Sequence, residues 1–264
     1  MKKILLIIGI LTQSYFGISQ KIKIIDYKKL PIIQDIRFGL TSLTNDGSII
    51  YALTLNPTKI IKYNSKTLEI IKTINLKLPN TTYEEIKGYK YSNGITYDGN
   101  YLWVAFAAKG KIYKINKNSG KIITHIPGPP IEHIGHQYDG LDFDGEYFWI
   151  IRNNYIKNSN KYPGGPVLFK LSTSGKVLSK YDIPCYHISG LDYKEDYLWM
   201  NQVGDGNNGI LSKFSINDCS FTETYHLDST FGNPNSISFM NQYAYINTGS
   251  ASTRKIYKIK LLKE

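Results

Sequence analysis

A repeated motif constrains the fold of this 264-residue chain more than any other feature. Three clear copies are "GITYDGNYLWVAF" from Gly94, "GLDFDGEYFWIIR" from Gly140 and "GLDYKEDYLWMNQ" from Gly190. Weaker copies begin at Gly39, with three extra residues before its turn, and at Ser236. One aromatic position recurs every 46 to 52 residues, at Tyr51, Trp103, Trp149, Trp199 and Tyr245. A period of that length, made of strands and turns, is typical of a β-propeller blade.

Each copy predicts four antiparallel strands, with an Asp-Gly type of turn between the first two, and helical periodicity is absent. The last copy stops after its third strand, "KIYKIK", whereas "KIKIIDYKKLP" from Lys21 to Pro31 resembles a fourth strand. Pairing these two ends removes an exposed sheet edge. We therefore predict an all-β, five-bladed propeller closed by the N-terminal strand. Six blades are the alternative, if residues 80–92 hold further structure.

The first residues have the layout of a secretory signal peptide. Lys2 and Lys3 precede a short apolar run from Ile4 to Leu11, and small residues follow it. The apolar run is too short to span a bilayer, which needs about 20 residues. We expect residues 1–19 to be a signal peptide and residues 20–264 to be one propeller domain. The mature protein is then exported, either periplasmic or secreted, and not bound to a membrane.

The charge pattern argues against a nucleic-acid partner. Lysine and arginine exceed aspartate and glutamate by 32 to 21, but the lysines are scattered along half-exposed strands and form no basic block. We expect a monomer. The two cysteines, Cys185 and Cys219, fall at opposite ends of the predicted blades, too far apart for a disulfide, so both are predicted to be free thiols.

Two sets of repeated residues have a structural interpretation. The recurring Trp and Tyr residues are predicted to pack between blades rather than to form a carbohydrate platform. Asp142 and Asp192 occupy one repeat position, where other copies have Thr96 and Ser238. A catalytic carboxylate pair is conceivable there, but hydrogen-bonded polar groups of the inner strands are the preferred interpretation.

Small polar residues recur where the inner strands begin and where the second strands end. In a propeller these positions meet at the mouth of the central channel. Such a ring suits a small polar ligand, a saccharide or a peptide, although Asn and Ser are also common turn formers. The candidate ligand-binding residues are Asn93, Asp139, Arg152, Asn153, Ser189, Asn201, Gln202, Asn235 and Asn247.

Titratable residues near the same mouth are the catalytic candidates, namely Asp139, Glu132, His136 and His187. With His133 they also suggest a zinc site, and the carbonyl and carboxylate oxygens suggest Ca²⁺, but the His-x-x-His spacing on a loop is weak evidence. Our prediction is that the protein holds no metal and no cofactor.

The blade motifs, including "GITYDGNYLWVAFAAKGKIYKINKNSGKI", resemble exported bacterial propellers of the glutaminyl cyclotransferase-like and NHL-type groups. That resemblance implies five blades and conversion of N-terminal Gln to pyroglutamate. The family's "FTQGL" corresponds to "RFGL" at Arg37 to Leu40. Its "FGEGL" corresponds to "YSNGI", which puts Asn93 at the position of the family's glutamate. We favour a propeller that binds a small polar ligand or partner chain at its mouth. The alternatives are a glutaminyl-peptide cyclotransferase-like enzyme and a non-enzymatic interaction scaffold.

Overall fold

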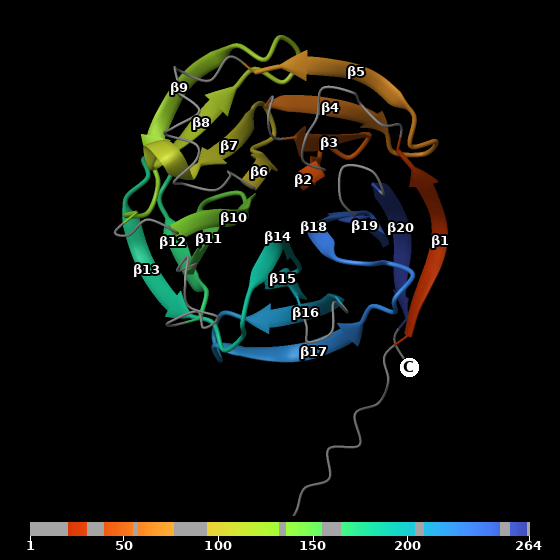
Figure 1. Ribbon diagram of the computed structural model, residues 1–264. Coiled ribbons are helices and arrows are strands. Elements are labelled where there is room, and N and C mark those ends of the chain that lie inside the picture. The colour runs from red at the N-terminus through yellow and green to blue at the C-terminus, as the bar shows by residue number, and fades with distance from the viewer. Residues whose placement is uncertain are drawn as a thin grey trace, which may run out of the picture.

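The computed structural model describes residues 21–30, 40–54, 58–76, 94–131, 136–154, 165–203, 209–248 and 254–262. Within these ranges the strands form five four-stranded antiparallel sheets, which are arranged radially around a central axis (Figure 1). The predicted all-β, five-bladed propeller is confirmed. The predicted signal peptide lies outside the described residues.

Each blade uses consecutive strands from the axis outward. Blade 1 is β2 (Leu40–Asn45), β3 (Ile49–Thr54), β4 (Lys59–Asn64) and β5 (Ile70–Asn75). Blade 2 is β6 (Gly94–Tyr97), β7 (Leu102–Phe106), β8 (Lys111–Ile115) and β9 (Ile122–Pro127), with the 3-10 turn η1 (Ala107–Lys109) after β7. Blade 3 is β10 (His136–Phe143), β11 (Phe148–Asn154), β12 (Val167–Leu171) and β13 (Val177–Asp182). Blade 4 is β14 (Ile188–Lys194), β15 (Tyr197–Val203), β16 (Gly209–Ser215) and β17 (Ser220–His226).

Blade 5 combines both ends of the chain, as predicted. It contains β18 (Pro234–Met240), β19 (Tyr243–Thr248) and β20 (Lys255–Leu262), and its outermost strand is β1 (Lys21–Lys29). The β1–β20 pairing is antiparallel and runs from Lys21 opposite Leu262 to Lys29 opposite Lys255. Figure 1 shows β1 lying along the outside of β20. The backbone edge of β20 is therefore paired rather than exposed.

The hydrophobic core is divided into five clusters, each lying between two neighbouring blades. The recurring aromatic residues each belong to a different cluster, and none is more than 7% exposed. The Trp103 ring, for example, meets Phe148 of the next blade at a centroid distance of 4.9 Å. This confirms that these aromatic residues pack between blades.

The first repeat is shorter than its sequence suggested. Its turn needs no three extra residues, because the register of β2 against β3 shifts between Leu40 and Ser42, at the same place as in later blades. Ser42, and not Gly39, is therefore the counterpart of the repeat glycine. The sequence comparison was wrong at this point because a glycine lay by chance three residues upstream.

Both cysteines are free thiols, as predicted. Cys219 is exposed in the turn between β16 and β17, whereas Cys185 lies partly buried between β13 and β14. Burial raises the pKa of the Cys185 thiol to about 12, which makes it a poor nucleophile at neutral pH. Among the described residues no helix is long and apolar enough to cross a membrane.

Candidate functional site

A β-bulge marks the same end of four inner strands. Strand register shifts between Tyr138 and Gly140 in β10, and equivalent shifts occur in β2, β14 and β18. In β10, β14 and β18 the residues that the strand register skips are the predicted mouth residues Asp139, Ser189 and Asn235. A bulge turns an additional side chain out of the ladder, and such bulges often occur near binding sites. We call this end of the propeller axis the mouth.

Blade 3 is joined to blade 4 at the mouth by Asn153, whose side chain is fully buried. Its Nδ2 donates to Asp139 Oδ2 at 2.6 Å and to the Ile188 carbonyl oxygen at 2.6 Å. Its Oδ1 accepts from the Ile188 backbone N–H at 3.2 Å. These three bonds engage both ends of the amide, so Asn153 holds two blades together and positions the buried Asp139 carboxylate.

Blade 5 is joined to blade 1 in a similar way. Asn247 Nδ2 donates to the Leu40 carbonyl oxygen at 2.6 Å, and its Oδ1 accepts from the Ser236 hydroxyl. Asn235 Nδ2 donates to the same Leu40 oxygen at 3.2 Å. Both asparagines therefore have a structural role between blades, which differs from the turn-forming role considered as the alternative to ligand binding.

Asn201 occupies the position of Asn247 one blade earlier, between blades 4 and 5, but its side-chain amide has no partner among the described residues. The side chain is fully buried, and within the described part of the chain neither Nδ2 nor Oδ1 makes a hydrogen bond. Asn201 is paired with Gly190, as Asn247 is paired with Ser236, so no hydroxyl lies where the Ser236 hydroxyl meets Asn247 Oδ1. The Pro234 carbonyl oxygen stands at the position of the Leu40 oxygen that Asn247 binds, and it accepts from Ser189 Oγ at 2.6 Å.

Two predicted ligand-binding residues point away from this group. Arg152 Nη1 donates to the Pro130 carbonyl oxygen at 2.6 Å, and its guanidinium lies 5.0 Å from the centroid of the Phe169 ring. Gln202 Nε2 donates to Ser212 Oγ at 2.7 Å, within blade 4. The structure therefore brings Asp139, Asn153, Ser189, Asn201, Asn235 and Asn247 to the blade junctions of the mouth, and it uses Arg152 and Gln202 elsewhere.

The remaining catalytic and ligand-binding candidates are not among the residues that the structure brings to the blade junctions of the mouth. His187 is partly buried in the connection that leads into β14. Asn93 and Glu132 lie outside the described residues, and of His136 only the backbone, at the start of β10, is described. No group of three or more His, Cys, Asp or Glu side chains within the described ranges is arranged to hold a metal ion.

The repeated aspartates of the inner strands lie toward the opposite end of the axis. Asp142 accepts from Thr96 Oγ1 at 2.6 Å and from the Tyr193 backbone N–H at 2.5 Å. Asp192 accepts from the Phe239 backbone N–H at 3.0 Å. Each carboxylate thus bonds to the backbone of the following blade, which supports the interpretation as hydrogen-bonded structural groups.

Burial makes these two carboxylates costly to ionise. It raises the pKa of Asp142 to about 6, and burial together with the neighbouring Asp142 charge raises the pKa of Asp192 well above its usual range. Between the unfolded pKa near 4 and the folded pKa near 6, the folded chain binds more protons than the unfolded chain. The free energy of unfolding therefore falls as pH rises through this window.

We expect Asp142→Asn to weaken that pH dependence. The wild-type free energy of unfolding should fall by up to about 3 kcal/mol between pH 4 and pH 6. In the variant this decrease should be smaller, because the asparagine side chain does not titrate. Urea unfolding at half-unit steps of pH measures both curves. Asp182→Asn, on an exposed position of β13, is the control that should follow wild type. If the free energy of unfolding had the same pH dependence in wild type and Asp142→Asn, the raised pKa would not belong to Asp142.

Comparison with solved structures supports the same architecture. Glutaminyl cyclase of Myxococcus xanthus has a TM-score of 0.65 at 11% sequence identity, over 92% of this chain and 98% of that chain. The chain shares its fold with a glutaminyl cyclase. Hydrazine synthase of Kuenenia stuttgartiensis (TM-score 0.48, 12% identity, 81% and 56% of the two chains) and a nidogen/laminin complex (0.48, 12%, 78% and 71%) are more distant. No family model matches the sequence.

One set of polar contacts was missed at the sequence level. In blades 1 to 3 an aspartate in the first turn bonds to the recurring aromatic residue five positions later. The pairs are Asp46 with Tyr51, Asp98 with Trp103 and Asp144 with Trp149, each at 2.7 Å. The five-residue spacing is visible in the sequence. Aspartate is also common in turns, however, so the spacing alone did not indicate a bond to the Tyr hydroxyl or the Trp indole N–H.

Proposed function

We propose that this protein binds a small polar ligand at the mouth, and that the ligand presents a group which both donates and accepts hydrogen bonds. The observation that supports this is the buried Asn201 amide, because leaving such a group unpaired costs about 1–3 kcal/mol. A carboxamide of a peptide-like ligand matches it, since its N–H faces Oδ1 and its carbonyl oxygen faces Nδ2. A saccharide hydroxyl satisfies the same two atoms less completely.

The other mouth residues suit a ligand of that kind. Asp139 lies one blade junction away from Asn201, and its buried carboxylate is held in place by Asn153. A fixed carboxylate recognises an ammonium or N–H group, and the Asn201 amide recognises a carboxamide. A short peptide with a free N-terminus and an amide side chain offers both groups.

The second candidate function is cyclisation of N-terminal glutamine. It is supported by the likeness to a glutaminyl cyclase over nearly the whole of both chains. In that reaction the α-amine attacks the γ-amide carbon, a C–N bond forms, and ammonia leaves. The proton released by the attacking amine has to reach the departing nitrogen. Asp139 is the group we assign to that transfer, and Asn201 the group that holds the γ-amide.

Binding is tested by calorimetry with a short peptide that begins with Gln, and the same peptide beginning with Ala serves as the ligand control. We expect Asn201→Leu to weaken binding of the Gln peptide at least about tenfold. The variant should fold normally, because no hydrogen bond within the described protein is lost. Gln202→Leu is the matched control, since Gln202 is a neighbour whose amide faces Ser212. Equal affinity of wild type and Asn201→Leu would contradict the proposal.

The same samples separate binding from catalysis. Mass spectrometry follows ammonia loss from the Gln peptide against a sample without protein. Ammonia loss that disappears in Asp139→Asn, while the peptide still binds, supports the cyclase. Tight binding without turnover supports a binding protein. A saccharide that binds in an Asn201-dependent manner, in place of the peptide, would change the ligand class but keep the site.

A further inference from the structure

A second site lies between blades 4 and 5, away from the mouth, where one blade departs from a pattern that others keep. In blades 2 and 3 the indole N–H of the recurring tryptophan donates to a turn aspartate, at 2.7 Å from Asp98 and from Asp144. The same carboxylates accept backbone N–H groups of their own turns, as Asp98 does from Tyr101 at 2.6 Å. A carboxylate is therefore a regular component of these two blade junctions.

A lysine ammonium accompanies that carboxylate in blades 1 and 2. Lys117 Nζ lies 3.1 Å from Asp46 Oδ2, and Lys114 Nζ lies 3.8 Å from Asp98 Oδ2. The carboxylate thus sits between an aromatic donor and a cation. Such charge-assisted bonds are stronger than those between neutral groups.

Blade 4 has no carboxylate at this position, because Lys194 stands five residues before Trp199. The Lys194 ammonium reaches across to blade 5, donating to the Asn241 carbonyl oxygen at 3.0 Å and lying 4.8 Å from the Phe239 ring centroid. Among the described residues no acceptor bonds to the Trp199 indole N–H. Trp199 therefore keeps its indole N–H donor, but blade 4 lacks the aspartate that accepts from this N–H in blades 2 and 3.

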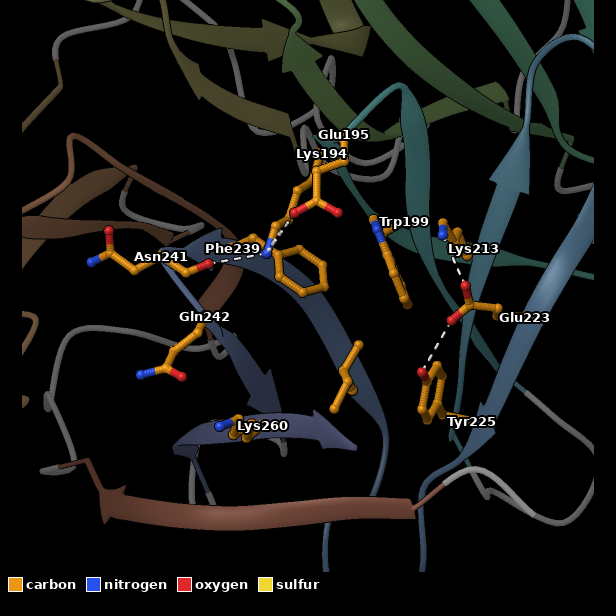
Figure 2. Close-up of a pocket in the computed structure, with 11 residues that line it drawn as sticks. Lys194, Glu195, Trp199, Lys213, Glu223, Tyr225, Phe239, Asn241, Gln242 and Lys260 are labelled. Atoms are coloured by element: carbon orange, nitrogen blue, oxygen red, sulfur yellow. Dashed lines mark hydrogen bonds and ion pairs between the residues drawn. The ribbon is translucent and has the colours of Figure 1, made fainter. Parts of the chain in front are cut away.

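A cavity of about 420 Å³ opens at this junction. Its apolar walls are Trp199, Phe239, Tyr225 and Leu261, and the Trp199 and Phe239 rings lie 5.0 Å apart. Figure 2 shows these rings facing the space between the two blades, with the ammonium of Lys194 beside Phe239. The two rings pack against each other at this distance and form one continuous aromatic wall, against which a flat apolar group can lie.

The charged groups around the cavity favour an anion. Lys194, Lys213 and Lys260 line it, against the carboxylates of Glu195 and Glu223. Glu223 pairs with Lys213 at 2.8 Å, and Glu195, whose side chain is 73% exposed, lies 3.7 Å from Lys194. Lys260 has no ion-pair partner within the described ranges. One positive charge therefore remains in excess at the cavity.

We propose that this cavity binds a small organic acid with a flat apolar body, whose carboxylate takes the place of the missing turn aspartate. The carboxylate accepts from the Trp199 indole N–H and pairs with a lysine ammonium, as Asp98 does in blade 2. The apolar body lies against the aromatic wall formed by Trp199 and Phe239. A molecule of about ten heavy atoms fits the volume and should bind with a Kd of about 0.1–1 mM.

The three tryptophan indole N–H signals in a two-dimensional ¹⁵N NMR spectrum test this directly. Trp103 and Trp149 already donate to carboxylates and act as internal references. We expect phenylacetate to shift the Trp199 signal downfield, toward the other two, in a saturable manner. Phenylacetamide, which has the same ring and no charge, should shift it at least about tenfold less at equal concentration.

Lys194→Asp is the decisive variant, because it restores the carboxylate found in blades 2 and 3. Without ligand, its Trp199 signal should already lie near those of Trp103 and Trp149, and phenylacetate should no longer move it. Lys121→Asp makes the same change of charge at an exposed position of blade 2, and it should respond like wild type.

Trp199→Phe keeps the aromatic wall but removes the donor, so it covers the case in which Lys194→Asp does not fold. Ligand-observed NMR of phenylacetate should then show affinity reduced at least about fivefold. An unmoved Trp199 signal at 10 mM phenylacetate (about ten times the weakest expected Kd), an equal response to phenylacetamide, or undiminished binding by Trp199→Phe would each overturn the proposal.

Discussion

A chain that begins at Leu30, and therefore lacks β1, is expected to lose the closed ring of blades. The eight paired positions between β1 and β20 supply backbone hydrogen bonds, and at about 1 kcal/mol for each bond their loss costs on the order of 5 kcal/mol. It also exposes the edge of β20, which carries the core residues Ile256, Tyr257 and Ile259. We expect a melting temperature lower by more than about 10 °C and concentration-dependent association through the free edge.

Thermal melts and size-exclusion chromatography with light scattering measure both effects. A synthetic peptide of residues 21–30, added to the shortened chain, should restore the melting temperature and reverse the association. Tyr27→Ser is the matched control, because the Tyr27 side chain is 57% exposed and the variant keeps the backbone ladder. A shortened chain with the melting temperature and molar mass per particle expected from the full chain would show that β1 does not close the ring.

The second large effect is expected for Gly190→Ala, on the inner strand of blade 4. A Cβ atom there would lie 2.5 Å from Ser236 Cα and 3.1 Å from the Ile237 backbone nitrogen. Both are backbone atoms of the next blade, so no side-chain rotation relieves the contact and the inner strands have to separate. We expect the free energy of unfolding to fall by about 2–4 kcal/mol and the melting temperature by about 5–12 °C.

Gly47→Ala separates this steric effect from ordinary glycine strain. Gly47 has a φ of +88°, and a Cβ atom added there would meet nothing within 4 Å, so its replacement costs only backbone strain of about 1 kcal/mol. Denaturant unfolding of the two variants gives the comparison. If Gly190→Ala were no more destabilised than Gly47→Ala, the inner strands would pack less closely than the structure indicates.

The close packing of inner strands also explains which parts of the mouth were predictable. Bulges recur at Asp139, Ser189 and Asn235, each directly before the repeat glycine or Ser236 on a crowded inner strand. The sequence therefore indicated correctly that small polar residues gather at one end. It offered no means of separating Asn153 and Asn247, which are used between blades, from Asn201, which is not.

Local periodicity in the amino-acid sequence was sufficient to predict the number of blades, the strand order and the packing role of the recurring aromatics. The closure by the N-terminal strand was also predictable from the sequence, because residues 21–31 resemble the fourth strand that the last repeat lacks. Which polar groups find partners, in contrast, depends on the tertiary structure. Asn201 lacks them within the described residues, because Gly190 opposite it has no hydroxyl and the Pro234 carbonyl oxygen of the next blade bonds to Ser189.

The same reason applies to the cavity between blades 4 and 5. Lys194 is visible in the sequence as a departure from aspartate, but its consequence depends on Phe239 and Asn241, which come from the following blade. Hydrogen-bond partners across a blade junction are fixed by the spatial register of two separate sheets. A repeat pattern in the sequence predicts the strands of each blade. It does not predict which residues of the next blade each side chain contacts.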